Sequence, residues 1–483
     1  MNGKGQGLSE DWLSLIIGLL IFVLALGQLF GVDLLGWVVT TSVWMDPSKA
    51  LAPASKAYAG LGGVGALIAT YVGLLVLMTA GAAMLRANIG RFVLAFTVVF
   101  WISYLCWIVG SYAHFAVNTP ADMQKFGIDW SLRLTAEGGF VVALIVGLIV
   151  GNFLPGLAGW MREAVRPELY IKIAIVILGG FLGIVSAEKL GLATSLMFLG
   201  LASIIVAYLI FWSVVYYVAR VWFGFSREWA APLASGISVC GVSAAIATGG
   251  AIRARPTVAV MVSSLVVIFA VVELLILPGI AGYFLSDQPI AAGAWMALSV
   301  KTDGAAVASG AITEGLIYAK AAAAGIKYQP GWILGTAATV KVFIDIFIGV
   351  WAFVLAYIWT KHIEPRAAGD TARVSEIWER FPKFVIGYVL TFAIILLIAL
   401  TASAPTVAAV KAAMGEANTF RGIFFVLTFF TIGVMSDFRK LWEEGIGRLA
   451  AVYLLTLFGF VIWVGLVISL LFYSGVKPPL VTG

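Results

Sequence analysis

The sequence predicts an all-α polytopic membrane protein, and three observations support that fold class. Of the 483 residues, 62% are hydrophobic and 11% are charged, whereas about 25% are charged in ordinary soluble domains. The chain contains 53 Gly and 17 Trp, residue types that are frequent in membrane helices and at membrane interfaces. Long uncharged runs also recur along the chain. These features exclude soluble, disordered and disulfide-rich classes.

Thirteen stretches have the length and apolarity of membrane segments, because a bilayer core of about 30 Å takes roughly 20 apolar residues per helix. Eight carry no charge, and they cover residues 12–32, 57–85, 92–121, 138–161, 190–219, 229–252, 384–410 and 449–476. Five are shorter or interrupted, and they cover residues 169–185, 256–286, 291–318, 331–360 and 421–436. The first run has neither a basic stretch before it nor a small-residue cleavage site after it, so we interpret it as a retained helix.

The Lys and Arg residues of the loops predict the orientation, because cytoplasmic loops carry an excess of them. With the N-terminus inside, the loops on the cytoplasmic side contain more Lys and Arg than the loops on the opposite side. This bias places the N-terminus in the cytoplasm and the C-terminus in the periplasm. Arg253 and Arg255 leave one question open, because they lie outside if 229–252 crosses the membrane and inside if it is a re-entrant hairpin.

We divide the chain into an N-terminal extension with three transmembrane helices, residues 1–137, and a main domain of about ten membrane segments, residues 138–483. The soluble stretch 362–383 has mixed charge and no apolar periodicity, which is typical of a cytoplasmic linker. No Gly-rich phosphate loop followed by Lys-Ser or Lys-Thr occurs in the sequence, and this argues against ATP-driven pumping.

The segment 229–255 predicts a broken helix at a binding site. It reads WAAPLASGISVCGVSAAIATGGAIRAR, and such breaks are tolerated in a membrane only where they face protein or a water-filled cavity. An unwound stretch near 238–243 would expose N–H groups at the start of the second half-helix, and these attract an anion. The alternative is a tightly packed helix of small residues. The substrate-binding candidates of this segment are Ser238, Cys240, Gly241 and Ser243.

Charged residues inside other apolar runs are further candidates, since such a charge costs roughly 2.5 kcal/mol or more on insertion and normally faces a pathway or a partner. Lys301, Thr302 and Asp303 lie between two apolar runs, and a loop at the membrane interface is the alternative. Lys341 and Asp345 share one helix face, where we expect them to pair, and a purely architectural pair is the alternative. We assign these residues to two roles, with Lys301, Thr302 and Lys341 binding substrate and Asp303, Asp345 and Glu273 binding a coupling proton or cation.

Enzymatic and metal chemistry have little support in the sequence. The chain has two cysteines and two histidines, and Cys106 and Cys240 both lie in long apolar runs. Paired carboxylates with a His, metal-ligand spacing and an activated nucleophile are not found, so we expect no enzyme, no metal and no cofactor besides Na+ or H+ as a coupling ion. A membrane enzyme and a non-transporting scaffold are the alternatives of another class, although a scaffold would not need broken helices.

Four motifs carry a resemblance to a known family, and they are GLIVGNFLPGL at 147–157, YIKIAIVILGGFLGI at 170–184, SGISVCGVSAAIAT at 235–248 and FVLTFFTIGVMSDFRKL at 425–441. From about residue 138 onward the chain resembles the sulfate exporter family of YeiH-type bacterial inner-membrane transporters. The resemblance implies inverted repeats of five segments, as in bile-acid symporters and cation/proton antiporters. It also implies broken helices at 229–252 and 421–441 and an elevator-like motion of a core against a scaffold.

The sequence departs from the family pattern at two places. Where the family has Glu-Pro after Ala-Thr, this chain has Gly249 and Gly250, and where the family has a His-Glu pair, this chain has Lys301 and Thr302. Lys341 matches a family lysine. The exchanged residues change both the charge and the proton-handling groups, so the identity of the substrate and of the coupling ion stays open.

We therefore expect a secondary transporter of the bacterial inner membrane that moves a small anion such as sulfate, sulfite or an organosulfonate. A sodium- or proton-coupled carboxylate or bicarbonate carrier is the alternative within transport. The expected partners are the small anion and the lipid bilayer, with a homodimer allowed and no nucleic acid.

Overall fold

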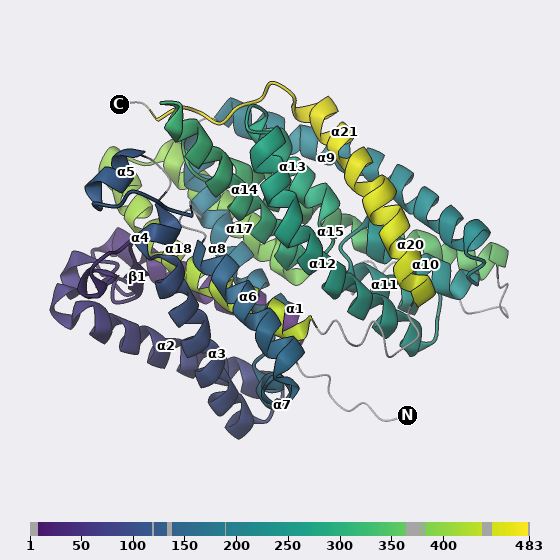
Figure 1. The fold of residues 1–483 in the computed structure, drawn as a ribbon, viewed down its shortest axis with the longest axis horizontal. Helices are drawn as coiled ribbons and strands as arrows, with labels where there is room; N and C mark the ends of the chain where they lie inside the picture. Colours follow the sequence, from purple (N-terminus) through teal and green to yellow (C-terminus); the bar gives the residue numbers. More distant parts are fainter. Residues whose placement is uncertain are drawn as a thin grey trace. The chain divides into compact units, whose positions relative to one another are not determined.

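The computed structural model of the chain describes residues 8–117, 120–132, 138–188, 190–363, 378, 382–436 and 447–481. Its secondary structure is helical apart from one small antiparallel sheet, in which β1 (Val39–Thr41) pairs with β2 (Leu51–Pro53). The chain forms two compact units, which are described separately (Figure 1). The first combines Met1–Leu190, Tyr318–Lys327 and Lys383–Met435, and the second combines Gly191–Ile317, Tyr328–Pro382 and Ser436–Gly483.

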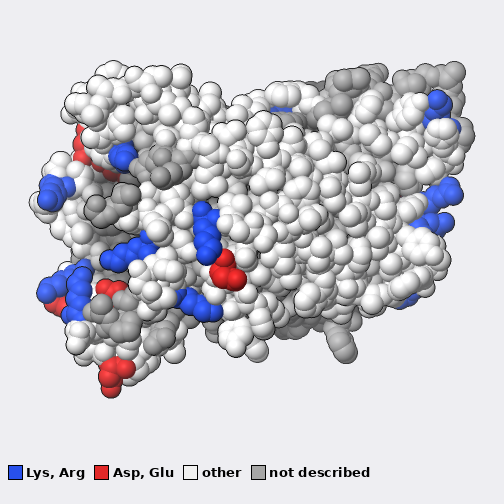
Figure 2. Space-filling model, turned by 90° about the horizontal axis from the view of Figure 1, so that it is seen from above, with Lys and Arg blue, Asp and Glu red and all other residues white. Residues whose placement is uncertain are grey.

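The expected class of multi-pass helical membrane protein is confirmed. Among the described residues, nine helices are long and apolar enough to cross a membrane, and a pair bent by 102°, Gly138–Phe153 with Pro155–Glu163, gives a tenth. On the face shown in Figure 2, uncharged side chains cover most of the described surface, which suits contact with lipid. The number of candidate spans is lower than the expected thirteen, in part because 229–252 and 291–318 are each interrupted.

The first unit is built around one central helix, α8. Its helices are α1 (Glu10–Ala25), α2 (Gly62–Met84), α3 (Ile89–Gly110), α4 (Ala113–Ala116), α5 (Pro120–Lys125), α6 (Gly138–Phe153), α7 (Pro155–Trp160), α8 (Pro167–Glu188), α17 (Lys383–Thr401) and α18 (Ala404–Met435), with 3-10 turns at Leu26–Phe30, Pro47–Lys49, Lys56–Leu61 and Met161–Glu163. α8 approaches α17 so closely that a Cβ on Gly179 would lie 2.3 Å from the carbonyl oxygen of Tyr388. Glycine in the run ILGGFLG therefore lets two helix backbones touch.

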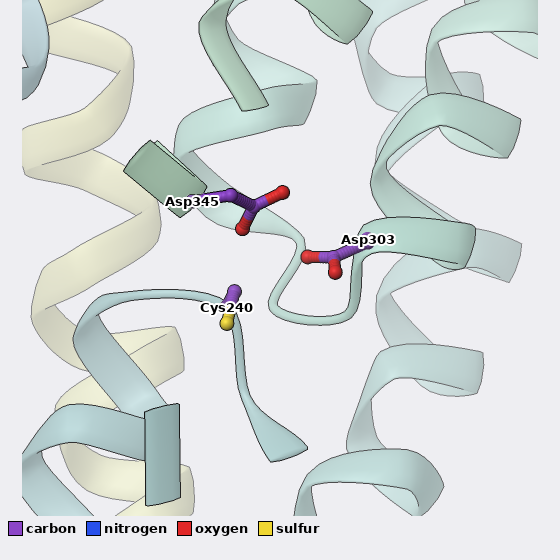
Figure 3. Close-up of side chains that lie close together, drawn as sticks. All are labelled: Cys240, Asp303 and Asp345. Carbon is purple, nitrogen blue, oxygen red and sulfur yellow. The ribbon is translucent and has the colours of Figure 1, made fainter. Parts of the chain in front are cut away.

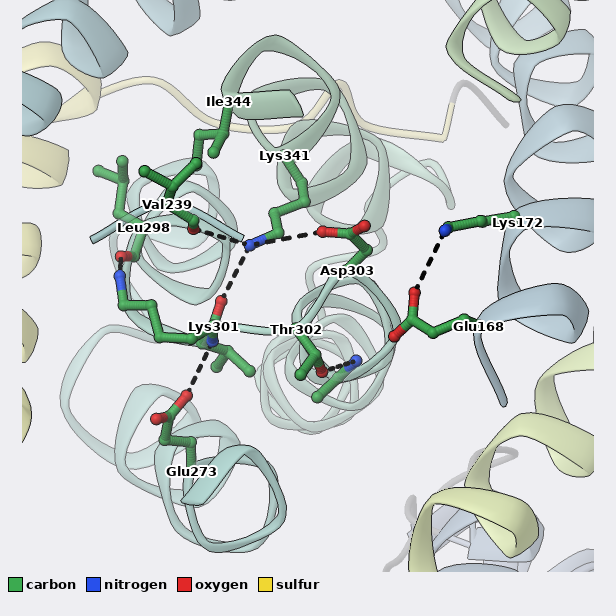
Figure 4. A network of polar contacts seen from close by, with 12 residues as sticks. Glu168, Lys172, Val239, Glu273, Leu298, Lys301, Thr302, Asp303, Lys341 and Ile344 are labelled. Atoms are coloured by element: carbon green, nitrogen blue, oxygen red, sulfur yellow. Dashed lines mark hydrogen bonds and ion pairs between the residues drawn. The ribbon is translucent and has the colours of Figure 1, made fainter. Parts of the chain in front are cut away.

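Ion pairs join α1 to α8 within the first unit. The Lys172 ammonium of α8 lies 2.8 Å from Asp11 Oδ1 of α1. It also lies 3.6 Å from Glu168 Oε2 in the first turn of α8 (Figure 4). One turn earlier, the Arg166 guanidinium binds the Glu10 carboxylate. Lys172, the charge inside the expected segment 169–185, is thus neutralised where the two helices begin. The separation of residues 1–137 as an extension stays a prediction.

The second unit contains both interrupted segments. Its helices are α9 (Leu190–Tyr217), α10 (Arg227–Ser238), α11 (Val242–Ala251), α12 (Pro256–Phe284), α13 (Pro289–Ser299), α14 (Asp303–Ala323), α15 (Trp332–Ile358), α20 (Gly447–Thr456) and α21 (Ile462–Tyr473), with π-helical turns at Val218–Trp222, Trp359–Ile363 and Leu457–Val461. The Glu314 carboxylate accepts hydrogen bonds from the N–H groups of Gly331, Ile333 and Leu334. It therefore caps α15, whose N-cap residue Gly331 has no side chain to do so.

The break expected within 229–252 is confirmed. α10 ends at Ser238 and α11 begins at Val242, so the alternative of a continuous small-residue helix is wrong. Gly241 has φ +73° and ψ −107°, a backbone conformation that residues with a Cβ rarely adopt. Glycine at this position therefore permits the sharp turn between the two half-helices.

The two half-helices form a hairpin. Thr248 Oγ1 of α11 donates to Ser235 Oγ of α10 at 2.7 Å. Farther from the break, the Glu228 carboxylate accepts from the backbone N–H and the guanidinium of Arg255 at 2.8, 3.0 and 3.1 Å. Because residues at similar distances from the break are neighbours, α11 runs back along α10. Arg255 thus lies at the end where α10 begins, and the geometry is that of a re-entrant segment.

The second interruption lies between α13 and α14. α13 ends at Ser299 and α14 begins at Asp303. Val300 and Lys301 have no exposed surface, and Thr302 is 5% exposed. These residues therefore lie in the interior of the unit and not on an exposed loop.

Two helices near the C-terminus differ from the expected spans 384–410 and 421–436. α17 ends at Thr401, and α18 is continuous from Ala404 to Met435. Pro405 lies in the first turn of α18, where its missing N–H is tolerated, and the Ala-rich polar stretch that follows has high helix propensity. The broken helix expected at 421–441 is not present up to Met435, and residues 437–446 lie outside the described residues. So does most of the expected linker 362–383.

Candidate functional site

The two interrupted segments of the second unit meet at their breaks. A Cβ on Gly241 would lie 2.7 Å from the carbonyl oxygen of Lys301, so the two backbones are in direct contact. All residues of 239–241 and 300–302 are buried. We call these two stretches together the crossing. Buried backbone without helical hydrogen bonding needs other partners, and the surrounding charged side chains provide several of them.

Lys341 of α15 reaches the crossing with its ammonium group. Its Nζ atom donates to the carbonyl oxygens of Val239 and Val300, at 3.3 Å each, and lies 3.8 Å from Asp303 Oδ1 (Figure 4). These carbonyls belong to the residues that directly follow α10 and α13, at the helix ends where partial negative charge concentrates. The Lys341 side chain is 1% exposed, so its charge is balanced inside the protein.

Two carboxylates and a thiol converge beside Lys341. One ligand atom each from Cys240, Asp303 and Asp345 lies within 4.8 Å of the others, and all three residues are buried (Figure 3). Cys240 lies at the tip of the hairpin, Asp303 is the first residue of α14, and Asp345 lies on α15. Sulfur and carboxylate oxygens could hold a metal cation, which the sequence did not indicate, since these residues are far apart along the chain.

Lys301 is fixed by partners on three sides. Its backbone N–H donates to Glu273 Oε2 of α12 at 3.0 Å, and its ammonium donates to the carbonyl oxygen of Leu298 (Figure 4). The same ammonium lies 5.1 Å from the centre of the Phe211 ring, a cation–π contact. The carboxylate that we assigned to a coupling ion, Glu273, thus binds the backbone of the break.

The remaining candidates have simpler surroundings. Thr302 Oγ1 accepts from the N–H of Ala305 at 3.2 Å and so caps α14. Ser238, the last residue of α10, is 4% exposed. Ser243 lies in the first turn of α11, but its side chain is outside the described part of the structure. The N-cap residue of α11 is Gly241, which has no side chain to cap the helix, so the N–H groups of the first turn lie next to the break.

The crossing thus gathers Lys301, Lys341, Asp303, Asp345 and Glu273 in the interior of one unit. Removing such groups from water costs several kcal/mol per ion, and apolar residues of similar volume would usually be at least as stable. Their presence therefore points to a function that requires charge at this position rather than to stability.

Sequence reasoning found the charged residues of the crossing but missed its carbonyl ligands. The backbone oxygens of Val239 and Val300 carry no signal in their side chains. The only indirect signals are the glycine at 241 and the polar residues after Val300, which show where a helix ends.

Known proteins resemble this chain along most of its length. The family model described as Conserved hypothetical protein 698 matches residues 130–452, a range that contains every residue of the crossing. A UPF0324 membrane protein of Nitrosomonas europaea is 40% identical over 489 residues, which is 99% of each chain. Another, of Rhodopirellula baltica, is 31% identical over 399 residues, 81% of this chain and 63% of that protein. A protein of Archaeoglobus fulgidus is 51% identical over 171 residues, which cover 31% of this chain and 91% of that protein. No solved structure matches.

Proposed function

This chain belongs to the family described as Conserved hypothetical protein 698, the UPF0324 membrane proteins, and we propose that it is a secondary transporter of a small anion. The substrates that we favour are sulfate, sulfite and organosulfonates. The proposed location is the bacterial inner membrane, with the N-terminus in the cytoplasm and the C-terminus in the periplasm.

The observation that carries the proposal is the contact between two interrupted segments in the interior of an apolar unit. Non-helical backbone at membrane depth is tolerated only where it is buried in protein or lines a cavity, and transporters place substrate and ion sites at such breaks. Ionisable residues inside the membrane likewise mark pathways and binding sites. A scaffold would need neither the breaks nor the charges.

Positive groups at the crossing support an anion as the substrate. The first turn of α11 offers N–H groups at the positive end of a helix, and the Lys341 ammonium lies at the same crossing. Asp303 and Asp345 oppose an anion, because their carboxylates lie in the same cluster. An anion would therefore bind together with a proton or a cation that offsets this negative charge, and this arrangement is expected of a coupled transporter.

The mechanism that we propose is elevator-like alternating access, with inverted repeats of five segments. The proposed mechanism rests on the family resemblance and on the break at Ser238–Val242. The relatives are named as membrane proteins, which agrees with a function in the membrane. A sodium- or proton-coupled carboxylate or bicarbonate carrier is the second candidate, since the carboxylates of Asp303 and Asp345 also suit a coupling cation.

The test is flux into liposomes that contain the purified full chain, in sodium-free buffer. Labelled sulfate, sulfite and an organosulfonate are offered, and uptake of at least one is expected. Lys341→Met and Lys301→Met should lower that uptake by at least about tenfold, because a lost charge contact of about 1.4 kcal/mol corresponds to a factor of ten. The matched control is Lys320→Met, which removes an exposed lysine from α14.

Two outcomes would reject the anion proposal. One is the absence of flux for all three anions with folded protein, and the other is unchanged flux in both crossing variants. Uptake of a carboxylate or bicarbonate, measured across sodium and pH gradients, would instead support the second candidate.

A further inference from the structure

Lys341 lies where two negative helix ends converge. α10 ends at Ser238 and α13 ends at Ser299, and the carbonyl oxygens of the residues that follow, Val239 and Val300, both accept from its ammonium. The terminal carbonyls of a helix have no intrahelical partner, and together they carry about half a negative charge. Two such ends facing one point create a strong preference for a single positive charge there.

The ligands around this point are those that an alkali cation prefers. All three groups that contact the ammonium offer oxygen, namely the two carbonyls and Asp303 Oδ1, and hard cations bind carbonyl and carboxylate oxygens. The N···O distances of 3.3, 3.3 and 3.8 Å are long for hydrogen bonds. The ammonium is therefore held mainly as a charge among oxygens.

We infer that the Lys341 ammonium occupies a binding site for a monovalent metal cation, formed by the carbonyls of Val239 and Val300 and the Asp303 carboxylate. Lys341 is thus a cation attached to the protein. The wild-type chain does not take up Na+ at this position, whereas a chain without the ammonium does. The inference deepens the proposed function by identifying the Lys341 ammonium as the cation that offsets the negative charge at the crossing, but the site exists whether or not an anion is carried.

The experiment compares thermal unfolding of the purified full chain in NaCl, KCl and choline chloride at equal ionic strength. A cation that binds only the folded protein raises its melting temperature, and the rise grows with the logarithm of the cation concentration once that exceeds the dissociation constant. The wild type should melt at the same temperature in NaCl and in choline chloride. Lys341→Ala, which removes the ammonium and its methylene chain, should gain a rise of a few degrees that grows with the NaCl concentration and is not seen in choline chloride.

A second variant and two controls make the result decisive. Lys341→Met keeps most of the stem volume and should also gain the Na+ response. Lys301→Met removes a buried ammonium that donates to Leu298 instead, and it should gain no response. Adding Asp303→Asn to Lys341→Met should abolish the gained response, because the carboxylate ligand is lost.

Three results would overturn the inference. The first is an equal Na+ response in the wild type and the variants, which would place the cation elsewhere. The second is folded Lys341 variants that ignore Na+. The third is failure of both variants to fold in either salt, since bound Na+ should replace the missing charge. The measurement uses no substrate, so it can fail or succeed independently of the anion flux.

Discussion

Glu273 is the residue whose role changes most when its contacts are known. Its carboxylate accepts the backbone N–H of Lys301 and is itself fully buried. A buried N–H without an acceptor costs about 1–3 kcal/mol, so this contact fixes the break between α13 and α14. To accept the Lys301 N–H, the side chain at position 273 needs only an acceptor oxygen. To carry a coupling proton, it must also be able to ionise.

This difference gives a prediction for two Glu273 variants. Glu273→Gln keeps an amide oxygen as acceptor, so we expect a melting temperature and an anion flux close to those of the wild type. Glu273→Ala should lower the melting temperature and the flux, because the Lys301 N–H loses its partner. Thermal unfolding of each variant gives the melting temperature, and liposome assays give the flux. A Gln variant that folds normally but has lost coupled transport would instead show that Glu273 carries the proton.

At the residue scale, the sequence predicted which ionisable groups of the second unit are buried but not all of their partners. We expected Lys341 to pair with Asp345 on its own helix, and the ion pair in the structure joins it to Asp303 of α14. Spacing along one helix reveals neighbours on that helix only, whereas the break at 300–302 brings Asp303 in from another element. Backbone carbonyls are equally invisible to a reading of side chains.

At the element scale, the hairpin of α10 and α11 depends on the conformation of Gly241. Its φ of +73° is unfavourable for other residues, and an added Cβ would lie 2.4 Å from Val266 Cγ1 and 2.7 Å from the Lys301 carbonyl. Such strain costs about 1–3 kcal/mol, and the overlap would separate the two breaks.

We therefore predict that Gly241→Ala lowers the melting temperature by several degrees and reduces flux to near background. The matched control is Gly249→Ala in the same hairpin, where the nearest atom to an added Cβ is Ala259 Cβ at 3.4 Å, an ordinary contact. Thermal unfolding and liposome flux of both variants provide the measurement. Equal effects at the two glycines would contradict a special role for the hairpin tip.

Composition was enough to locate the break of the hairpin but not its direction. Pro232 and the glycines indicated a weak point in the helix. The hydropathy of 229–252 was compatible both with a helix that spans the membrane and with a re-entrant hairpin. The direction depends on contacts between distant residues, such as Glu228 with Arg255. In α18 the sequence predicted an interruption that does not exist. Lys411 and its neighbours were assigned to a loop between two spans, although the surrounding residues favour a helix.

At the scale of the whole molecule, the membrane class followed from hydropathy alone, and the relatives named as membrane proteins agree with it. The number of spans did not follow, because an apolar stretch can fold as two half-length helices. The crossing could not be predicted as a unit, since it combines two breaks with charged side chains from α12, α14 and α15.

The central claim is that the crossing is a transport site, and Cys240 allows a direct measurement. The chain has two cysteines, so Cys106→Ala leaves Cys240 as the single thiol, at the tip of the hairpin and 2% exposed. In liposomes, a negatively charged methanethiosulfonate reagent should modify Cys240 at a measurable rate, because alternating access must open the crossing to water. The transported anion should slow this reaction, and a cysteine-free variant sets the background. An account without transport at the crossing predicts the opposite result, in which Cys240 reacts only after the protein is denatured.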